Sequence, residues 1–427
     1  MTPSVIPPED WSEAIKLGRT PALIDVEAVI DTLVIRANRA QRRTIGFPAA
    51  TDIDWSRTRG LFSRLFNNVG DPSTAPGGEA HTNSLEVEVV QWFADLVGLP
   101  QNDRWGYVTS GGTESNIAAL RVARDRYPDA VLYLTHASHY SIPKTAGLLG
   151  LDPSDVVLVE DGRYGEMDYE HFEYLVAQRR DRPAIVVATA GTTLWEAVDQ
   201  TDQIEAILHG YGVHRRHVHV DAALSGIPLA LDGMLGLGAG SPVDSVSISG
   251  HKFLGTPIPC GVVVMRDSVR VSKGEHVNYV ATVDSTVTGS RCGQASALLW
   301  AAIAMYGRNG HQSRAEQARQ IAAYAVERIS SLGWPVYRHP AAFTVVMQTP
   351  PPVLVADFGW VLSVDGDLCH IICMPGVQRD VIDDFVSDLG KVIGRPVLVP
   401  HRSRNSRYGA SWRTAAAASG EDSLVSG

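Results

Sequence analysis

The sequence predicts an α/β protein built on a mostly parallel sheet with helices on both faces. Between Trp105 and Arg266, short apolar and β-branched runs alternate with helical stretches, which is the pattern of successive βαβ units. Polar or glycine-rich segments follow several of these runs, at the strand ends where open α/β sheets bind ligands. Beyond this region, helices and a few short strands indicate a smaller α+β part.

An arm and one clear helix precede the alternating region. Residues 1–50 are proline-rich at the start and then carry a basic, helix-like piece over Arg36–Arg43, which predicts an N-terminal arm. A helix is predicted over Asn83–Val97, because its apolar residues form one stripe. Asn83 is the expected N-cap, with Glu86 three residues later as in a capping box.

Seven strands and three helices account for the alternating region itself. The predicted strands are Gly106–Val108, Ala130–Leu134, Val156–Val159, Ala184–Ala188, His217–Val220, Ser245–Ile248 and Gly261–Met265. The predicted helices between them are Glu114–Arg126, Tyr169–Arg179 and Gln203–His209. Short, continuous apolar runs are typical of strands buried on both faces, so these strands predict one covered, seven-stranded sheet.

The remaining elements form the smaller part of the chain. They are helices over Ala295–Met305, Gln312–Ser331 and Val377–Ile393, and strands over Phe343–Met347, Leu368–Cys373 and Val397–Val399. We therefore predict an arm over 1–50, a large domain over 51–300, a small α+β domain over 301–400 and a basic, solvated tail over 401–427. Within Leu368–Cys373, alternation separates His370 from the two cysteines, which favours a buried strand, and no metal site is predicted.

Composition and charge exclude several classes of protein. The chain has 427 residues, 44% of them apolar, and its 37 Lys+Arg and 47 Asp+Glu give a net charge of −10. Such a chain has no global electrostatic reason to bind nucleic acid or an anionic membrane. Four cysteines are too few for a disulfide scaffold, and no apolar run reaches the ~20 residues of a membrane span. Without a secretion signal at the N-terminus, the expectation is a cytoplasmic protein.

The first motif that carries chemistry is glycine-rich and opens a predicted helix. It runs Thr109-Ser110-Gly111-Gly112-Thr113-Glu114-Ser115-Asn116 directly after a strand. Glycines let the backbone approach a ligand closely, and the free N–H groups of a helix N-terminus suit a phosphate. A glycine-rich turn with an N-cap is an equally open interpretation of this motif alone.

Two further motifs place a lysine and an aspartate at strand ends. Lys252 ends the segment Ser249–Lys252, and desolvation would make its amine a nucleophile that forms an imine with an aldehyde. Asp221 follows an apolar strand and could hold a protonated pyridine nitrogen. Taken singly, Lys252 could lie on the surface and Asp221 could cap a turn. Together with the phosphate motif, they are the three contacts that pyridoxal phosphate needs.

The chain resembles the group II pyridoxal-phosphate decarboxylases, in the branch of bacterial histidine decarboxylases and plant serine decarboxylases. The motifs that carry this resemblance are Asn67–Asp71, Trp105–Glu114, His139–Ser141, Gly191–Thr193, Asp221–Gly226, Ser249–Lys252, Pro257–Gly261 and Thr288–Arg291. They extend over about residues 45–375. The chain departs from the branch's pattern at Ser115, Cys292 and Gln294, so the substrate is less certain than the cofactor.

The resemblance implies the fold type I architecture of the aspartate-aminotransferase-like enzymes, in an obligate homodimer with its sites at the interface. It implies α-decarboxylation of a small L-amino acid to its amine and CO2. Histidine is the first candidate, and serine, methionine or a branched aliphatic residue stay open. An aminotransferase or lyase on the same fold, with Arg291 as a carboxylate clamp, and a non-catalytic cofactor-binding protein are the alternatives.

The resemblance also implies the roles of individual residues. Lys252 would bind the cofactor as an imine, Asp221 would pair with its pyridine nitrogen and His139 would stack on its ring. Tyr279, within a loop over Val271–Thr286 that is expected to be mobile, would either protonate Cα after CO2 leaves or pack at the dimer interface. The expected cofactor-binding residues are Ser110, Gly111, Gly112, Thr113, Ser249 and His251 toward the phosphate, Ala223 against the ring, Thr193 at the 3-hydroxyl or carboxylate side, and Ser290 from the partner subunit.

Overall fold

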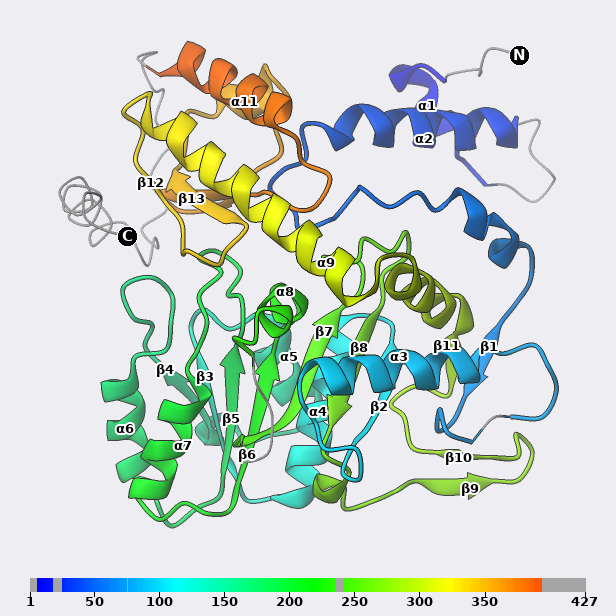
Figure 1. The fold of residues 1–427 in the computed structure, drawn as a ribbon, viewed down its shortest axis with the longest axis vertical. Coiled ribbons are helices and arrows are strands. Elements are labelled where there is room, and N and C mark those ends of the chain that lie inside the picture. Colours follow the sequence, from blue (N-terminus) through cyan, green and yellow to red (C-terminus); the bar gives the residue numbers. More distant parts are fainter. Residues whose placement is uncertain (1–5, 18–24, 75, 236–240, 394–427) are drawn as a thin grey trace.

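The large sheet has the seven strands that the sequence predicts. The structure is a computed structural model and describes residues 6–17, 25–74, 76–235 and 241–393. The strands are β2 (Trp105–Thr109), β3 (Val131–Thr135), β4 (Val156–Val159), β5 (Ala184–Thr189), β6 (Arg216–Asp221), β7 (Val243–Ser249) and β8 (Gly261–Met265). Their order across the sheet is β2-β8-β7-β6-β5-β3-β4, and only β8 runs antiparallel to its neighbours. The fold type I α/β architecture is thereby confirmed (Figure 1).

Helices cover this sheet on both faces (Figure 1). They are α3 (Asn83–Leu96), α4 (Gly112–Arg126), α5 (Ser141–Leu148), α6 (Tyr169–Ala177), α7 (Thr201–Gly210) and α8 (Gly226–Leu231). The predicted capping box at the start of α3 is wrong. Thr82 is the N-cap, no side chain caps the helix, and Glu86 is fully buried, where it accepts a hydrogen bond from the Val108 amide at 2.9 Å and pairs with Arg291. Tertiary contacts override the local capping pattern here.

A long helix connects the large sheet to a second, smaller one. The segment labelled α9 (Gly293–Ser330) consists of two helices, as predicted, which meet at a kink at Gly307, where φ is 59° and the backbone is not helical. The small antiparallel sheet contains β12 (Val336–Tyr337), β13 (Thr344–Gln348), β14 (Ser363–Asp365) and β15 (Leu368–Ile372), accompanied by α10 (Val353–Ala356) and α11 (Arg379–Val392). Cys369 and Cys373 are buried in the cluster between this sheet and its helices, so the buried-strand interpretation of this segment is confirmed.

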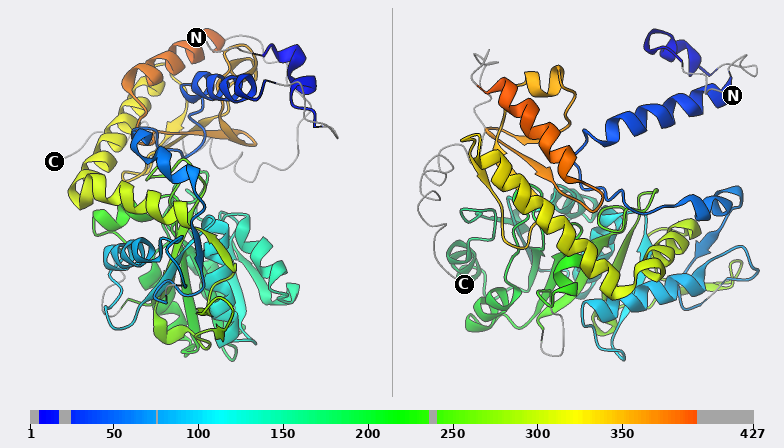
Figure 2. Two further views of the ribbon diagram at one scale, coloured as in Figure 1. Left: turned by 90° about the vertical axis from the view of Figure 1, so that its right-hand side faces the viewer. Right: turned by 45° about the horizontal axis from the view of Figure 1, so that its top comes forward.

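The N-terminal segment contains η1 (Pro8–Asp10), α1 (Trp11–Ala14) and α2 (Val26–Gln41). The far end of α2 projects past the body of the molecule (Figure 2). Its near end is tied to the small sheet's layer, because Arg42 forms ion pairs with Asp380 and Asp384 of α11, each at 2.9 Å. The predicted strand Val397–Val399 and the tail 401–427 lie outside the described residues.

Two short antiparallel strand pairs complete the structure. Strand β1 (Asn67–Val69) pairs with the distant β11 (Ser290–Cys292), and β9 (Glu275–Val277) pairs with β10 (Thr282–Asp284). The second pairing means that Val271–Thr286, which the sequence predicts to be a mobile loop, contains an antiparallel hairpin. The 3-10 turns are η2 (Ser56–Ser63), η3 (Pro153–Asp155) and η4 (Asp267–Val269). Within the described ranges, none of the helices has the length and apolarity that a membrane crossing needs.

Candidate active site

A cavity of about 310 Å³ lies where β5, β6 and β7 end. All the predicted site residues except Tyr279 and Ser290 line it. These are Ser110, Gly111, Gly112, Thr113, His139, Thr193, Asp221, Ala223, Ser249, His251 and Lys252. Glu114, Asn116, Tyr140, Thr189 and Gly191 complete the lining. The carboxyl ends of parallel strands meet at one edge of a sheet, which is why motifs more than 100 residues apart converge here.

One end of the cavity is built to receive an anion. Helix α4 begins at Gly112 without any side-chain cap, so its first N–H groups face the cavity unpaired by side chains. A Cβ on Gly112 would lie 2.8 Å from Ser249 Oγ, so only glycine fits between the helix and β7. Glu114 accepts a hydrogen bond from the Ser110 amide at 2.8 Å and holds the loop in place. This arrangement fits a phosphate group.

Lys252, the predicted nucleophile, lines this cavity. Its side chain keeps some exposure to the cavity, but protein atoms surround its amine, and this desolvation lowers the pKa of Lys252. The negative charges of Asp221 and Glu196 favour the protonated amine and so act to raise the pKa of Lys252. A lowered pKa increases the neutral fraction of the amine, which is the form that attacks an aldehyde.

Asp221 is the last residue of β6 and is only 3% exposed. One carboxylate oxygen, Oδ2, accepts a hydrogen bond from Asn116 Nδ2 at 2.9 Å, and Oδ1 accepts one from the Ala223 amide at 3.1 Å. These contacts fix the plane of the carboxylate at the wall of the cavity. A fixed, buried carboxylate suits a cationic ring nitrogen.

His139 precedes α5, and its ring lines the same cavity. Burial lowers the pKa of His139, so the ring is neutral near pH 7. His251 is also partly buried, its Nδ1 lies 2.9 Å from the Cys260 carbonyl oxygen, and burial lowers its pKa as well. Both rings are therefore neutral groups beside the amine of Lys252.

Tyr279 and Ser290 lie away from this cavity within the chain. Tyr279, between β9 and β10, is 91% exposed. Ser290 is exposed on β11, where its hydroxyl accepts a hydrogen bond from Asn67 Nδ2 at 3.2 Å. The chain brings neither residue to its own Lys252.

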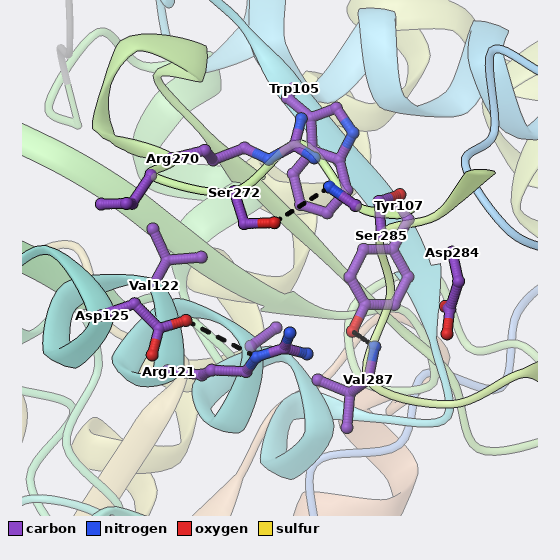
Figure 3. A pocket seen from close by; sticks show the side chains of 13 residues that line it. Trp105, Tyr107, Arg121, Val122, Asp125, Arg270, Ser272, Asp284, Ser285 and Val287 are labelled. Carbon is purple, nitrogen blue, oxygen red and sulfur yellow. Dashed lines mark hydrogen bonds and ion pairs between the residues drawn. The ribbon is translucent and has the colours of Figure 1, made fainter. Parts of the chain in front are cut away.

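A second, small cavity of about 40 Å³ lies where the base of the β9–β10 hairpin packs against β2 and α4 (Figure 3). The guanidinium of Arg270 lies 3.7 Å from the centre of the Trp105 ring. The Val287 amide donates to the Tyr107 hydroxyl at 3.3 Å. None of the predicted site residues lines this cavity, and its contacts serve to anchor the hairpin on the sheet.

Arg291, the clamp that an aminotransferase would need, is engaged elsewhere. It is buried, forms an ion pair with Glu86 and donates to the Gly70 carbonyl oxygen at 2.6 Å. These contacts join β11, α3 and the end of β1. Arg291 does not line the cavity that holds Lys252, so it is not available there to bind a substrate carboxylate.

The fold and the cavity define an enzyme that binds an aldehyde cofactor carrying a phosphate. The uncapped helix end, the desolvated amine of Lys252 and the buried carboxylate of Asp221 match the phosphate, aldehyde and pyridine nitrogen of pyridoxal phosphate. Residues 79–334 match the pyridoxal-dependent decarboxylase conserved domain. The chain belongs to the pyridoxal-dependent decarboxylase family. It is a carboxy-lyase that acts on an amino acid, with pyridoxal phosphate as its cofactor.

Similar proteins are found by sequence and by structure. The chain is 34% identical to a histidine decarboxylase of Mesorhizobium japonicum, over 84% of this chain and 96% of that protein. It is also 34% identical to serine decarboxylase 3 of Oryza sativa subsp. japonica, over 82% of this chain and 78% of that protein. The structure of L-methionine decarboxylase from Streptomyces sp.590 matches with a TM-score of 0.79 at 22% identity, over 90% of this chain and 98% of that one. The resemblance stated from the motifs is therefore confirmed.

Proposed function

We propose that the enzyme removes the α-carboxyl group of L-histidine, giving the corresponding amine and CO2. Relatives named histidine decarboxylase, 33–34% identical over most of the chain, support this substrate. Among the residues that the structure describes, Lys252 is the only lysine or arginine lining the cavity, which disfavours a substrate with an acidic side chain. Serine, methionine and branched aliphatic residues are the alternatives, and the serine decarboxylases among the relatives support the first of these.

The residues of the cavity take distinct parts in this proposal. Bound pyridoxal phosphate supplies a conjugated ring that accepts the electron pair left by CO2. The neutral amine of Lys252 would hold the cofactor through its aldehyde. Asp221 would keep the ring nitrogen protonated, and His139 and Ala223 would pack against the ring. Ser110, Gly111, Gly112, Thr113 and His251 would hold the phosphate, and Ser249 is a further cofactor-binding residue. Thr193 would lie at the 3-hydroxyl or the carboxylate side, and Ser290 would reach the phosphate of the partner's site.

A panel of L-amino acids tests the substrate and the reaction together. Purified holoenzyme is incubated with each amino acid, and CO2, amine and keto acid are measured. Histidine should give the highest kcat/KM, with CO2 and amine formed in equal amounts. A better substrate elsewhere in the panel contradicts histidine. A keto acid without CO2 indicates an aminotransferase, and bound cofactor without any product indicates a non-catalytic protein.

We propose that the enzyme is a homodimer whose second copy covers the N-terminal helix. Val26, Ile30, Leu33 and Val34 of α2 are each more than half exposed, although they are large and apolar. Together with the exposed Tyr279, such a surface is typical of an interface rather than of a free one. The projecting position of α2 lets it reach a neighbouring copy (Figure 2).

Charged residues introduced on the apolar face of α2 should dissociate this dimer. The double substitution Ile30→Asp and Leu33→Asp should weaken self-association by about 10²-fold or more, because it buries two carboxylates in an apolar interface. Light scattering across a dilution series measures the mass. Tyr174→Asp, on the exposed surface of α6, is the control and should leave the mass unchanged. A wild-type chain that is monomeric at all concentrations would contradict the proposal.

Tyr279 provides a prediction that follows from the dimer. We propose that it protonates Cα in the partner's site after CO2 leaves, which its exposure at the hairpin tip supports. Tyr279→Phe should release CO2 at a rate within about threefold of wild type but divert much of the product to aldehyde, since the phenol proton is missing. Separate assays of CO2, amine and aldehyde measure this. Amine formation at the parent rate would make Tyr279 an interface residue only.

Two further assignments complete the proposal. We propose a large domain over 51–300 and a small domain over 301–400, supported by a separate apolar cluster that, apart from Ile45, comes entirely from residues after 320. Limited proteolysis should then cut first between this cluster and the core of the large sheet.

We also propose a cytoplasmic location, supported by four cysteines that are all free thiols. Cell fractionation tests it.

A further inference from the structure

Asn116, which the sequence analysis does not single out, is at the centre of a buried hydrogen-bond network beside Asp221. It lies on the first turns of α4 and is only 1% exposed. Its amide nitrogen donates to Asp221 Oδ2 at 2.9 Å and to Ser141 Oγ at 3.0 Å. Its carbonyl oxygen accepts from Ser247 Oγ at 2.5 Å and lies 3.0 Å from His219 Nε2. Every hydrogen-bonding position of the amide is therefore used.

The chemistry of these partners fixes the direction of each hydrogen bond. A carboxylate only accepts, so the nitrogen of Asn116 must face Asp221 and its oxygen must face His219. His219 then donates from Nε2, which agrees with a pKa lowered to about 4 by burial and a neutral ring. Its Nδ1 lies 2.9 Å from Ser245 Oγ and accepts from that hydroxyl.

The hydrogen bonds on the other side of Asn116 determine which ring nitrogen of His139 carries the proton. The Ser141 amide donates to His139 Nδ1 at 3.2 Å, and an N–H group cannot accept. Nδ1 is therefore an acceptor, and the Ser141 hydroxyl, 2.8 Å from it, donates to it as well. In the neutral ring the proton must then be on Nε2, which is the nitrogen left free to donate within the cavity that His139 lines.

We propose that Asn116 is a positioning residue that sets Asp221 and His139 as one unit. It holds the Asp221 carboxylate directly as an acceptor, and it acts through Ser141 on His139, whose proton is then on Nε2. This inference rests on the proposed roles of Asp221 and His139 at the cofactor ring. Asn116 itself touches neither the lysine nor the reacting atoms in this arrangement. It orients the carboxylate, while Ser141 makes His139 a hydrogen-bond donor rather than a base.

Asn116→Asp tests the arm that reaches Asp221. The introduced carboxyl has nearly the same shape, but once it is ionised it places a second negative charge against Asp221 and cannot donate. Burial beside another carboxylate raises the pKa of this group, so the Kd for pyridoxal phosphate, measured by equilibrium dialysis, should exceed that of wild type by about 10-fold or more at alkaline pH, near about pH 9, the range expected for losing a hydrogen bond to a charged group. Affinity should recover toward wild type as the pH falls, because the protonated introduced carboxyl donates again.

Other titratable groups near Asp221 also contribute to the pH dependence of the cofactor Kd. His219 on β6, His139, and Lys252 after β7 face Asp221, and Lys144 on α5 acts on His139. All of these groups are retained in the variant, so a recovery that wild type lacks comes from the introduced carboxyl. Thr145→Val is the matched control, because Thr145 is fully buried and donates to the Ser141 carbonyl at 2.7 Å without belonging to the arm. It should leave the cofactor Kd within about twofold.

Ser141→Ala tests the arm that reaches His139. In protein labelled with ¹⁵N-histidine, the His139 signal, assigned with His139→Gln, should report a neutral ring protonated on Nε2. Loss of the hydroxyl removes one of the two donors to Nδ1 while the Ser141 amide stays, so the Nδ1-protonated tautomer should rise only to a measurable minority, and the cofactor Kd should change less than in Asn116→Asp. A wild-type ring protonated on Nδ1 would overturn the inference. An Asn116→Asp protein that folds, by thermal unfolding, and binds cofactor like wild type at every pH up to about 9 would also overturn it. Neither measurement uses turnover, so the inference stands or falls independently of the proposed substrate.

Discussion

Lys252→Ala is expected to remove both decarboxylation and covalent retention of the cofactor. Lys252 is the only lysine in the described part of the chain that lines the cavity, and its amine is desolvated beside the carboxylate of Asp221. We expect kcat to fall by about 10⁴-fold or more, as is typical when the nucleophile of a covalent catalyst is removed. The phosphate end of the cavity is unchanged in this variant, so pyridoxal phosphate should still bind, but reversibly.

Borohydride reduction of the wild-type holoenzyme measures the attachment directly. The cofactor should be fixed to the peptide that contains Lys252, and no label should survive denaturation of Lys252→Ala. Lys144→Ala is the control, since this lysine lies near the site on α5 with its amine 5.0 Å from the Tyr140 ring centre but does not line the cavity. Label on any other lysine would contradict the assignment.

Asp221→Asn is expected to separate cofactor binding from turnover. The amide keeps the shape of the side chain but lacks the negative charge that holds a protonated ring nitrogen. Turnover should fall by about 10²-fold or more, the range found when a group that stabilises developing charge is removed. The amide of Asn116 would also meet a new N–H group, which adds to the loss.

The control for this variant is another buried carboxylate that lies outside the cavity. Asp199 is 5% exposed, accepts from the Met167 and Thr189 amides at 2.8 and 2.7 Å, and its burial raises its pKa to about 7. Asp199→Asn should lower the thermal stability at least as much as Asp221→Asn does while leaving kcat per folded molecule within about threefold. Near-normal turnover in Asp221→Asn would show that this strand end does not serve the ring nitrogen.

Several features of the site could be predicted because they depend on short stretches of chain. The loop at Gly111 and Gly112 follows a strand and opens a helix, and its geometry requires glycine locally. Lys252 and Asp221 each follow an apolar strand, and in a parallel sheet such ends converge without further information. The seven strands were predictable for the same reason, since continuous β-branched runs are strands in any covered sheet.

Other features had no local signal. Asn116 belongs to a motif that suggested only a phosphate loop, yet its partners are up to 131 residues away on β6, β7 and α5. Glu86 had the spacing of a capping residue, but the buried guanidinium of Arg291 and the Val108 amide claim its carboxylate. The short helices α5 and α8 lack the repeated stripe that a longer helix shows.

By itself, the sequence determined the strands, the anion-binding helix end and the residues able to bind the cofactor, because local backbone preference and the end of an apolar strand suffice for each. Only the tertiary structure decided the orientation of Asp221 and His139, the use of Arg291 in a structural ion pair and the exposure of Tyr279. A hydrogen bond or an ion pair in a buried site depends on groups from distant segments meeting within about 3 Å. The periodicity and spacing of residues within one segment do not predict which groups from distant segments come into contact.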